Sequence, residues 1–158
     1  MLCVIDMQSC FDTAFCPSTI ASVQKLMRKA RQKNEHICIV EYMDDDEVWM
    51  GGETLSQVMD ELDGYQNWGR CGKWTDGGGD EIVEYMGLNN LLNDNIDACG
   101  VNWQFCVYRT LQQLREKLPN KIRVFEKACN GPAYGNWNYY LRTYRKLGII
   151  VNRNHVNE

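Results

Sequence analysis

One cysteine in the second half of the chain stands where a thiol can act as a nucleophile. Cys106 follows the apolar run Ile96–Val101, which has the pattern of a buried strand, and a helical pattern begins near Phe105. This predicts Cys106 in the first turn of a helix, where backbone N–H groups and the helix dipole lower the pKa of a thiol and can hold an oxyanion. The alternative is a buried structural thiol, since the chain has 8 cysteines and no two are spaced as C-x-x-C.

Two charged side chains occupy positions from which they could assist such a thiol. Asp6 ends an apolar run, and a carboxylate at the carboxyl end of a buried strand can serve as a general base. Its alternative use is to form a turn or a helix cap. Lys73 follows Gly72, but a phosphate-binding loop is excluded because Asn67 and Trp74 stand where that motif needs Gly and Ser or Thr. The alternative for Lys73 is a solvated surface lysine.

Metal-binding patterns are weak in this sequence. The two histidines, His36 and His155, are far apart and neither belongs to a metal-ligand motif. The acidic run at residues 44–47 offers oxygen ligands for a hard cation, but it lacks the spacing of a calcium loop. We therefore expect a solvated acidic loop, no metal and no cofactor.

The elements that must position these residues alternate between strand and helix patterns. Strands are predicted at residues 2–7, 36–42, 96–101, 121–126 and 149–151, with a possible short one around 72–74, and helices at 19–34, 54–62, 80–92, 105–118 and 136–147. This alternation predicts a three-layer α/β/α fold, with a mostly parallel, Rossmann-like sheet and helices on both faces. Ligands bind beyond the carboxyl ends of such strands. That rule selects the positions just after Ile5, around Lys73 and just after Val101.

Composition limits the class of protein. The chain has 158 residues, of which 44% are hydrophobic and 24% charged, which is typical of one globular domain, here residues 1–158. No apolar run approaches the roughly 20 residues that cross a bilayer, and the first residues lack the basic start of a signal peptide. The net charge of −4 does not favour nucleic acid binding. We expect a cytoplasmic protein without membrane or nucleic acid partners.

The segments around Asp6, Lys73 and Cys106 together resemble the isochorismatase-like cysteine hydrolases, which include nicotinamidases, carbamoylsarcosine-type amidases and isochorismatases. Residues 4–11 read Val-Ile-Asp-Met-Gln-x-x-Phe and are similar to the family's strand followed by Asp-x-Gln-x-x-Phe. Cys106 follows Lys73 by 33 residues, within a Gly-Val-x-x-x-x-Cys-Val pattern. Residues 123–129 resemble the family's next strand. The resemblance spans nearly the whole chain.

The resemblance implies a catalytic triad of Asp6, Lys73 and Cys106. Cys106 would attack the carbonyl carbon of a small amide, Asp6 would pass the thiol proton to the leaving amine, and Lys73 would hold Asp6 and favour the thiolate. The family also implies a cis peptide bond before Asn102, with the N–H groups of Asn102 and Cys106 facing the oxyanion. Water would then hydrolyse the thioester. A small-molecule substrate and a homo-oligomer, a dimer or a tetramer, are further expectations.

The sequence departs from the family at two places. Trp103-Gln104 replaces the usual Thr-Asp, so Trp103 is expected to reshape or narrow the substrate pocket. Phe11 and Trp74 are the other candidates for its lining, and the alternative for Trp74 is a core residue or an oligomer contact. Nicotinamidases carry an Asp-x-His metal motif after the second strand, but residues 41–47 contain no histidine. This argues against a zinc site and against nicotinamide as the substrate.

Three functions remain open from the sequence. The first is a metal-independent cysteine hydrolase that cleaves a C–N amide bond. The second is isochorismatase-like cleavage of a vinyl ether, in which Asp6 does the acid–base work and the thiol is dispensable. The third is a binding or interaction protein that retains the fold without activity, which Trp103-Gln104 and the short chain suggest.

Overall fold

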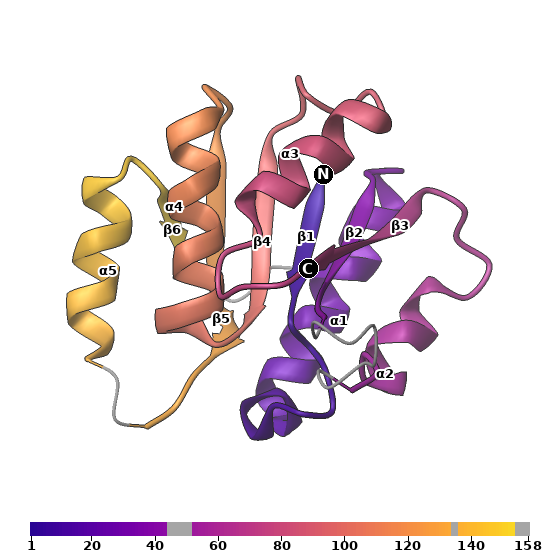
Figure 1. Ribbon diagram of the computed structural model, residues 1–158. Helices are drawn as coiled ribbons and strands as arrows, with labels where there is room; N and C mark the ends of the chain where they lie inside the picture. The colour runs from indigo at the N-terminus through magenta and orange to yellow at the C-terminus, as the bar shows by residue number, and fades with distance from the viewer. Residues whose placement is uncertain (44–51, 134–135, 154–158) are drawn as a thin grey trace.

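A computed structural model describes residues 1–43, 52–133 and 136–153. Its centre is a sheet of 6 strands, all parallel, in the order β3-β2-β1-β4-β5-β6 (Figure 1). The strands are β1 (Leu2–Ile5), β2 (Ile37–Tyr42), β3 (Trp68–Lys73), β4 (Ile96–Val101), β5 (Ile122–Asn130) and β6 (Ile150–Asn152).

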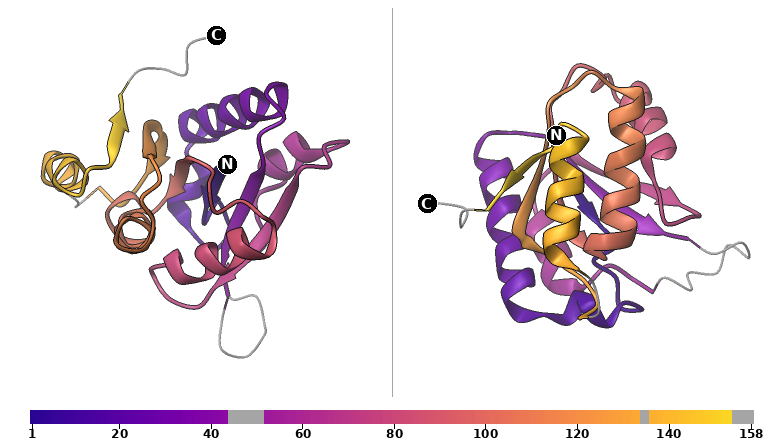
Figure 2. Two further views of the ribbon diagram at one scale, coloured as in Figure 1. Left: turned by 90° about the horizontal axis from the view of Figure 1, so that it is seen from above. Right: turned by 90° about the vertical axis from the view of Figure 1, so that its left-hand side faces the viewer.

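Helices cover both faces of this sheet, as Figure 2 shows for α1 on one side and for α3 and α4 on the other. The α-helices are α1 (Pro17–Gln32), α2 (Ser56–Met59), α3 (Gly79–Leu88), α4 (Tyr108–Lys117) and α5 (Trp137–Lys146). Shorter turns are the 3₁₀ helices η1 (Asp12–Phe15) and η2 (Asp60–Leu62) and the π-helical turn η3 (Trp103–Val107). The predicted three-layer α/β/α fold is confirmed.

The core follows from this layering. Strands covered on both faces must be apolar throughout, and all four residues of β1 are buried. Helix α1 contributes the buried stripe Val23, Leu26, Met27 and Ala30 at helical spacing, and begins with Pro17 in its first turn, where a proline is favourable. No helix among the described residues is both long enough and apolar enough to span a bilayer.

Several element boundaries differ from the prediction. Strand β3 begins at Trp68, four residues before the short strand expected around residues 72–74. Its glycines give it little strand propensity, so pairing with β2 over all six residues must impose the extended form. Strand β5 continues to Asn130 beyond the predicted end at 126, across a register shift against β4 between Ala98 and Gly100.

The helical segments also differ in detail. The predicted helix at 54–62 is a single turn, α2, followed by η2, and the helix predicted over 80–92 already ends at Leu88. The helix predicted over 105–118 begins as the π-helical turn η3, so that α-helical geometry starts only at Tyr108. Cys106 therefore lies in a widened turn that precedes α4.

The strand order reverses direction between β1 and β4. The connections from β1 build the sheet outward through β2 and β3, whereas β4, β5 and β6 extend it on the other side. At such a switch point the loops that leave two neighbouring strands diverge and open a crevice at the carboxyl edge of the sheet. For β1 and β4 this edge faces the bottom of Figure 1. Asp6 directly follows β1 and Cys106 lies in η3 after β4, so both residues lie at this edge.

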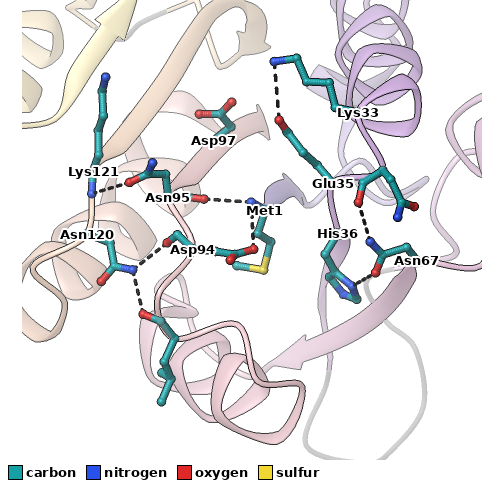
Figure 3. Close-up of polar contacts among 12 residues, drawn as sticks. Met1, Lys33, Glu35, His36, Asn67, Asp94, Asn95, Asp97, Asn120 and Lys121 are labelled. Atoms are coloured by element: carbon teal, nitrogen blue, oxygen red, sulfur yellow. Dashed lines mark hydrogen bonds and ion pairs between the residues drawn. The ribbon is translucent and has the colours of Figure 1, made fainter.

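The opposite edge of the sheet is held by structural polar contacts (Figure 3). The ammonium group of Met1 donates to Asn95 O over 2.9 Å. His36 binds Asn67 Oδ1 through Nδ1 at 2.8 Å and the Tyr85 hydroxyl through Nε2 at 2.6 Å. Both ring nitrogens of His36 are therefore occupied by structural partners at the edge away from Cys106.

Candidate active site

The structure brings Asp6, Lys73 and Cys106 together at the switch point. Asp6 follows β1, Lys73 is the last residue of β3, and Cys106 lies in η3 after β4. Lys73 Nζ lies 3.0 Å from Asp6 Oδ2, and both side chains are 0% exposed. Cys106 is also buried and lies close enough to both charged groups for them to shift its pKa. Three positions far apart in sequence thus form one buried cluster.

Lys73 is a structural part of this cluster and not a solvated surface residue. Its Nζ donates to Thr75 O over 2.9 Å and lies 5.0 Å from the centre of the Tyr42 ring. Gly78 leaves space for the lysine stem, because a Cβ at that position would lie 2.7 Å from Lys73 Cδ. These contacts direct the ammonium group to Asp6, and they offset part of the cost of burying a charge.

Asp6 combines a charge with unused hydrogen-bonding capacity. Asp6 Oδ2 is in ion-pair contact with Lys73 Nζ, and Asp6 accepts no other hydrogen bond from a described residue apart from its contact with the Cys106 thiol. Burial raises the pKa of Asp6, and the charge of Lys73 opposes that rise. A buried carboxylate is costly to maintain, and its raised pKa makes it better suited to accepting a proton from a neighbouring group.

The thiol of Cys106 is held in its neutral form. Burial is the main cause that raises its pKa, to about 12, and the negative charge of Asp6 adds to the rise, while Lys73 opposes it. The prediction that the helix terminus lowers this pKa is therefore wrong for the site as it stands. Local sequence suggested a helix dipole, but burial and a neighbouring carboxylate outweigh it. Ionisation of Cys106 requires a base, and Asp6 is the adjacent one.

Two residues explain why the backbone can place these groups so closely. Asp6 has φ 53°, a left-handed conformation that turns the chain sharply after β1. Gly100 has φ 127°, and a Cβ there would lie 2.0 Å from Ile5 O. Only glycine allows β4 to approach β1 this closely, so the glycine of the Gly-Val-x-x-x-x-Cys-Val pattern positions Cys106 beside Asp6.

We call residues 102–107 the oxyanion turn, after the role predicted for them. The carbonyl of Asn102 accepts from Phe105 N at 3.0 Å and from Val107 N at 3.2 Å, which closes the turn around Cys106. The expected cis peptide bond before Asn102 is wrong, because every peptide bond in the described part of the chain is trans. The roles of the Asn102 and Cys106 N–H groups stay predictions.

The three residues predicted to line the pocket have different surroundings. The Phe11 ring lies 6.4 Å from that of Tyr42, edge to face, so Phe11 adjoins the aromatic ring above Lys73. Trp74 is 51% exposed directly after Lys73. Trp103 differs from the prediction, because its ring is fully buried and stacks on Trp137 at 4.6 Å. Helix α5 supplies these aromatic partners, and the local sequence around position 103 could not show them.

Sequence reasoning missed the residues that hold the site together. Gln8 donates from Nε2 to Tyr42 O at 3.1 Å and accepts from Tyr42 N at 2.7 Å, which joins the loop after β1 to the end of β2. Its position in the Asp-x-Gln pattern was the available signal. No sequence signal pointed to Tyr42, because its role depends on its pairing with Lys73 between β2 and β3.

Metal ligands do not gather in this part of the fold. The described residues contain no group of three or more His, Cys, Asp or Glu side chains able to hold a metal ion. The acidic run at residues 44–47 lies outside the described residues.

Solved structures match this fold over nearly its whole length. An N-carbamoylsarcosine amidase from Thermoplasma acidophilum is 23% identical, covers 96% of this chain and 94% of its own, and has a TM-score of 0.74. A nicotinamidase from Staphylococcus aureus is 17% identical over 97% and 96% of the two chains, with a TM-score of 0.80. A MAR1 ribonuclease from Caenorhabditis elegans is 18% identical over 94% and 73%, with a TM-score of 0.76.

These likenesses show a shared fold. No protein-family model and no curated protein matches the chain. The predicted resemblance to the isochorismatase-like hydrolases is therefore confirmed at the level of the fold. The amidase and the ribonuclease show that proteins of this fold carry different names and reactions, so the function must be argued from the site.

Proposed function

We propose that this protein is a cysteine hydrolase that cleaves the C–N amide bond of a small molecule. The observation that supports this most is the buried Asp6–Lys73 ion pair at 3.0 Å, placed beside Cys106 at the switch point of the sheet. A buried carboxylate that is paired with a lysine and lies next to a neutral thiol is an arrangement of base and nucleophile.

The first half of the reaction makes a thioester. Asp6 takes the proton from Cys106 Sγ as Sγ forms a bond to the amide carbonyl carbon. The carbonyl oxygen becomes an oxyanion, which the N–H groups of the oxyanion turn would stabilise. Asp6 then gives its proton to the nitrogen as the C–N bond breaks, and an amine or ammonia leaves.

The second half returns the enzyme to its starting state. Asp6 takes a proton from a water molecule, whose oxygen attacks the thioester carbon. The C–S bond breaks, the product leaves as a carboxylic acid, and Sγ recovers a proton from Asp6. Lys73 stays charged throughout and keeps the carboxyl group of Asp6 in place.

The test is hydrolysis of a panel of small primary amides, scored by release of ammonia. We expect Cys106→Ser and Asp6→Asn to lower the rate by about a thousandfold or more, within the range for removal of a nucleophile or a general base. Cys16→Ser, which changes a half-buried thiol outside the cluster, should leave the rate unchanged.

The same variants separate the alternatives. A Cys106→Ser protein that keeps its activity on amides while Asp6→Asn loses it would contradict the thioester mechanism. Vinyl-ether cleavage predicts instead that the wild type releases no ammonia and cleaves a vinyl ether in a reaction that needs Asp6 but not Cys106. Absence of turnover on every amide, together with tight binding of a ligand, would favour a binding protein.

A further inference from the structure

One side-chain hydrogen bond joins the oxyanion turn to the loop after β1. Thr13 Oγ1 donates to Asn102 Oδ1 over 2.7 Å, across 89 residues of sequence. The carbonyl group of Asn102 is held separately, by the N–H groups of Phe105 and Val107. Asn102 is therefore fixed at its side chain and at its backbone, and the turn that carries Cys106 begins from a fixed residue.

Thr13 is held in turn by the neighbouring strand. Asn130 Nδ2 donates to Thr13 O over 2.8 Å. Asn130 is the last residue of β5 and pairs with Val101, the last residue of β4, directly before the oxyanion turn. Two hydrogen bonds therefore link Asn130 to Thr13 and Thr13 to Asn102. One end of this series is Asn102 in the oxyanion turn, and the other end, Asn130, pairs with the residue directly before that turn.

Thr13 also lies in a hydrogen-bonded segment that leads back to Asp6. It lies in η1, where Ala14 is fully buried and donates from N to Phe11 O at 2.8 Å. Phe11 N in turn donates to Gln8 O at 3.1 Å, two residues beyond Asp6. Loss of the hydrogen bond from Thr13 to Asn102 would therefore let the oxyanion turn move relative to Asp6.

We propose that Thr13 is a positioning residue whose hydroxyl group fixes the position of the oxyanion turn relative to Asp6. Asn130 holds Thr13 in place through the backbone carbonyl group of Thr13. This rests on the proposed hydrolase function, because it assigns the turn a role in binding the substrate carbonyl. Thr13 does not contact the reacting atoms through any of these bonds. Its effect is on the geometry of the N–H groups that meet the oxyanion.

The test compares Thr13→Val, which removes only the hydroxyl group, with Thr13→Ser, which keeps it. Thr143→Val is the matched control, because the Thr143 hydroxyl bonds Tyr139 O at 3.0 Å within helix α5. The rate at which each of two reagents labels Cys106 is measured by mass spectrometry. Chloroacetamide carries an amide carbonyl group, and methyl methanethiosulfonate does not. Hydrogen exchange of residues 102–107 is measured in the same proteins.

We expect Thr13→Val to slow chloroacetamide about fivefold to tenfold, the factor that one ordinary hydrogen bond is worth, while the methanethiosulfonate rate stays within about twofold. Exchange of residues 102–107 should accelerate by at least the same factor. Thr13→Ser and Thr143→Val should behave as wild type. Asn130→Ala should reproduce Thr13→Val more weakly, which provides a second variant if Thr13→Val does not fold.

Two results would overturn the positioning role. The first is unchanged exchange of residues 102–107 in Thr13→Val, whatever the reagents do. The second is equal slowing of both reagents, since that would place the effect on the thiol and not on carbonyl binding. A different result would contradict the hydrolase proposal itself: a ratio of chloroacetamide to methanethiosulfonate labelling rates that is no higher for wild-type Cys106 than for the thiol of free glutathione. In that case the hydrogen exchange of residues 102–107 would still decide the role of Thr13.

Discussion

At the scale of single residues, the site depends on an ion pair in which each partner stabilises the burial of the other. Asp6 and Lys73 are both 0% exposed, and each would be an uncompensated buried charge without the other. The pair lies close to Cys106, whose thiol is neutral because burial raises its pKa to about 12. The resting site therefore has the Asp6 carboxyl group beside a neutral Cys106 thiol, and not a thiolate.

Removing one partner of this pair should destabilise the fold more than removing both. We expect Asp6→Asn to lower the free energy of unfolding by about 3 kcal/mol, because it leaves Lys73 charged, buried and unpaired. The double variant Asp6→Asn/Lys73→Met should recover most of that loss. Urea denaturation at neutral pH measures both values, and a double variant no more stable than Asp6→Asn would contradict the pairing.

The Cys106 thiol should also make stability depend on pH. Its pKa is about 12 in the folded protein against 9.0 for an ordinary thiol, so the folded state holds the proton more tightly. Its contribution to stability is therefore complete below pH 9 and is lost as the pH rises from about 9 to about 12. Urea denaturation at pH 8, 9 and 10 should show a smaller loss in Cys106→Ala than in wild type, although the buried Cys99 and Cys129 contribute in both proteins.

At the scale of elements, the parallel sheet brings the ends of β1, β3 and β4 to one edge. This much could be predicted from sequence, because short apolar runs that alternate with helical stripes define parallel strands, and Asp6, Lys73 and Cys106 follow recognisable patterns. The start of β3 at Trp68 could not, since it depends on pairing with β2. The raised pKa of Cys106, the burial of Trp103 and the role of Thr13 also depend on contacts between distant segments, and no local pattern carries them.

The approach of β4 to β1 can be tested at Gly100. We expect Gly100→Ala to destabilise the protein by about 3 kcal/mol or more, because the added Cβ would collide with Ile5 O and the residue has positive φ. Gly87→Ala is the matched control: a Cβ there meets nothing within 4 Å, and alanine in helix α3 should stabilise by about 0.5 to 1 kcal/mol. Thermal denaturation of both variants decides, and a tolerated Gly100→Ala would contradict the close approach.

At the scale of the whole molecule, large apolar side chains are exposed in the segments at the carboxyl edge of the sheet. Phe15, Trp74 and Phe105 are 51%, 51% and 39% exposed, and they come from the segments that follow β1, β3 and β4. Exposed aromatic side chains in the segments beside a candidate site fit a substrate or a second protein surface. The homo-oligomer implied by the family resemblance is one way to cover them.

The oligomeric state can be measured directly. We expect light scattering coupled to size exclusion to give the mass of two or four chains, and Phe105→Ser to shift the protein toward the monomer if this rim is the interface. A wild-type protein that stays monomeric at high concentration would contradict the oligomer. The exposed side chains of Phe15, Trp74 and Phe105 would then be candidates for substrate contacts.

The most direct test of the central claim is the rate at which chloroacetamide labels Cys106 in wild type and in Asp6→Asn. Electrostatics alone predicts faster labelling in Asp6→Asn, because the charge of Asp6 raises the pKa of the thiol. A general base predicts slower labelling, and we expect a decrease of about a hundredfold at neutral pH. Cys16, whose pKa is lowered to about 7 by hydrogen bonding to Ser18, is an internal reference that should label equally in both proteins. Labelling of Cys106 that is unchanged or faster in Asp6→Asn would contradict the role of Asp6 as its base.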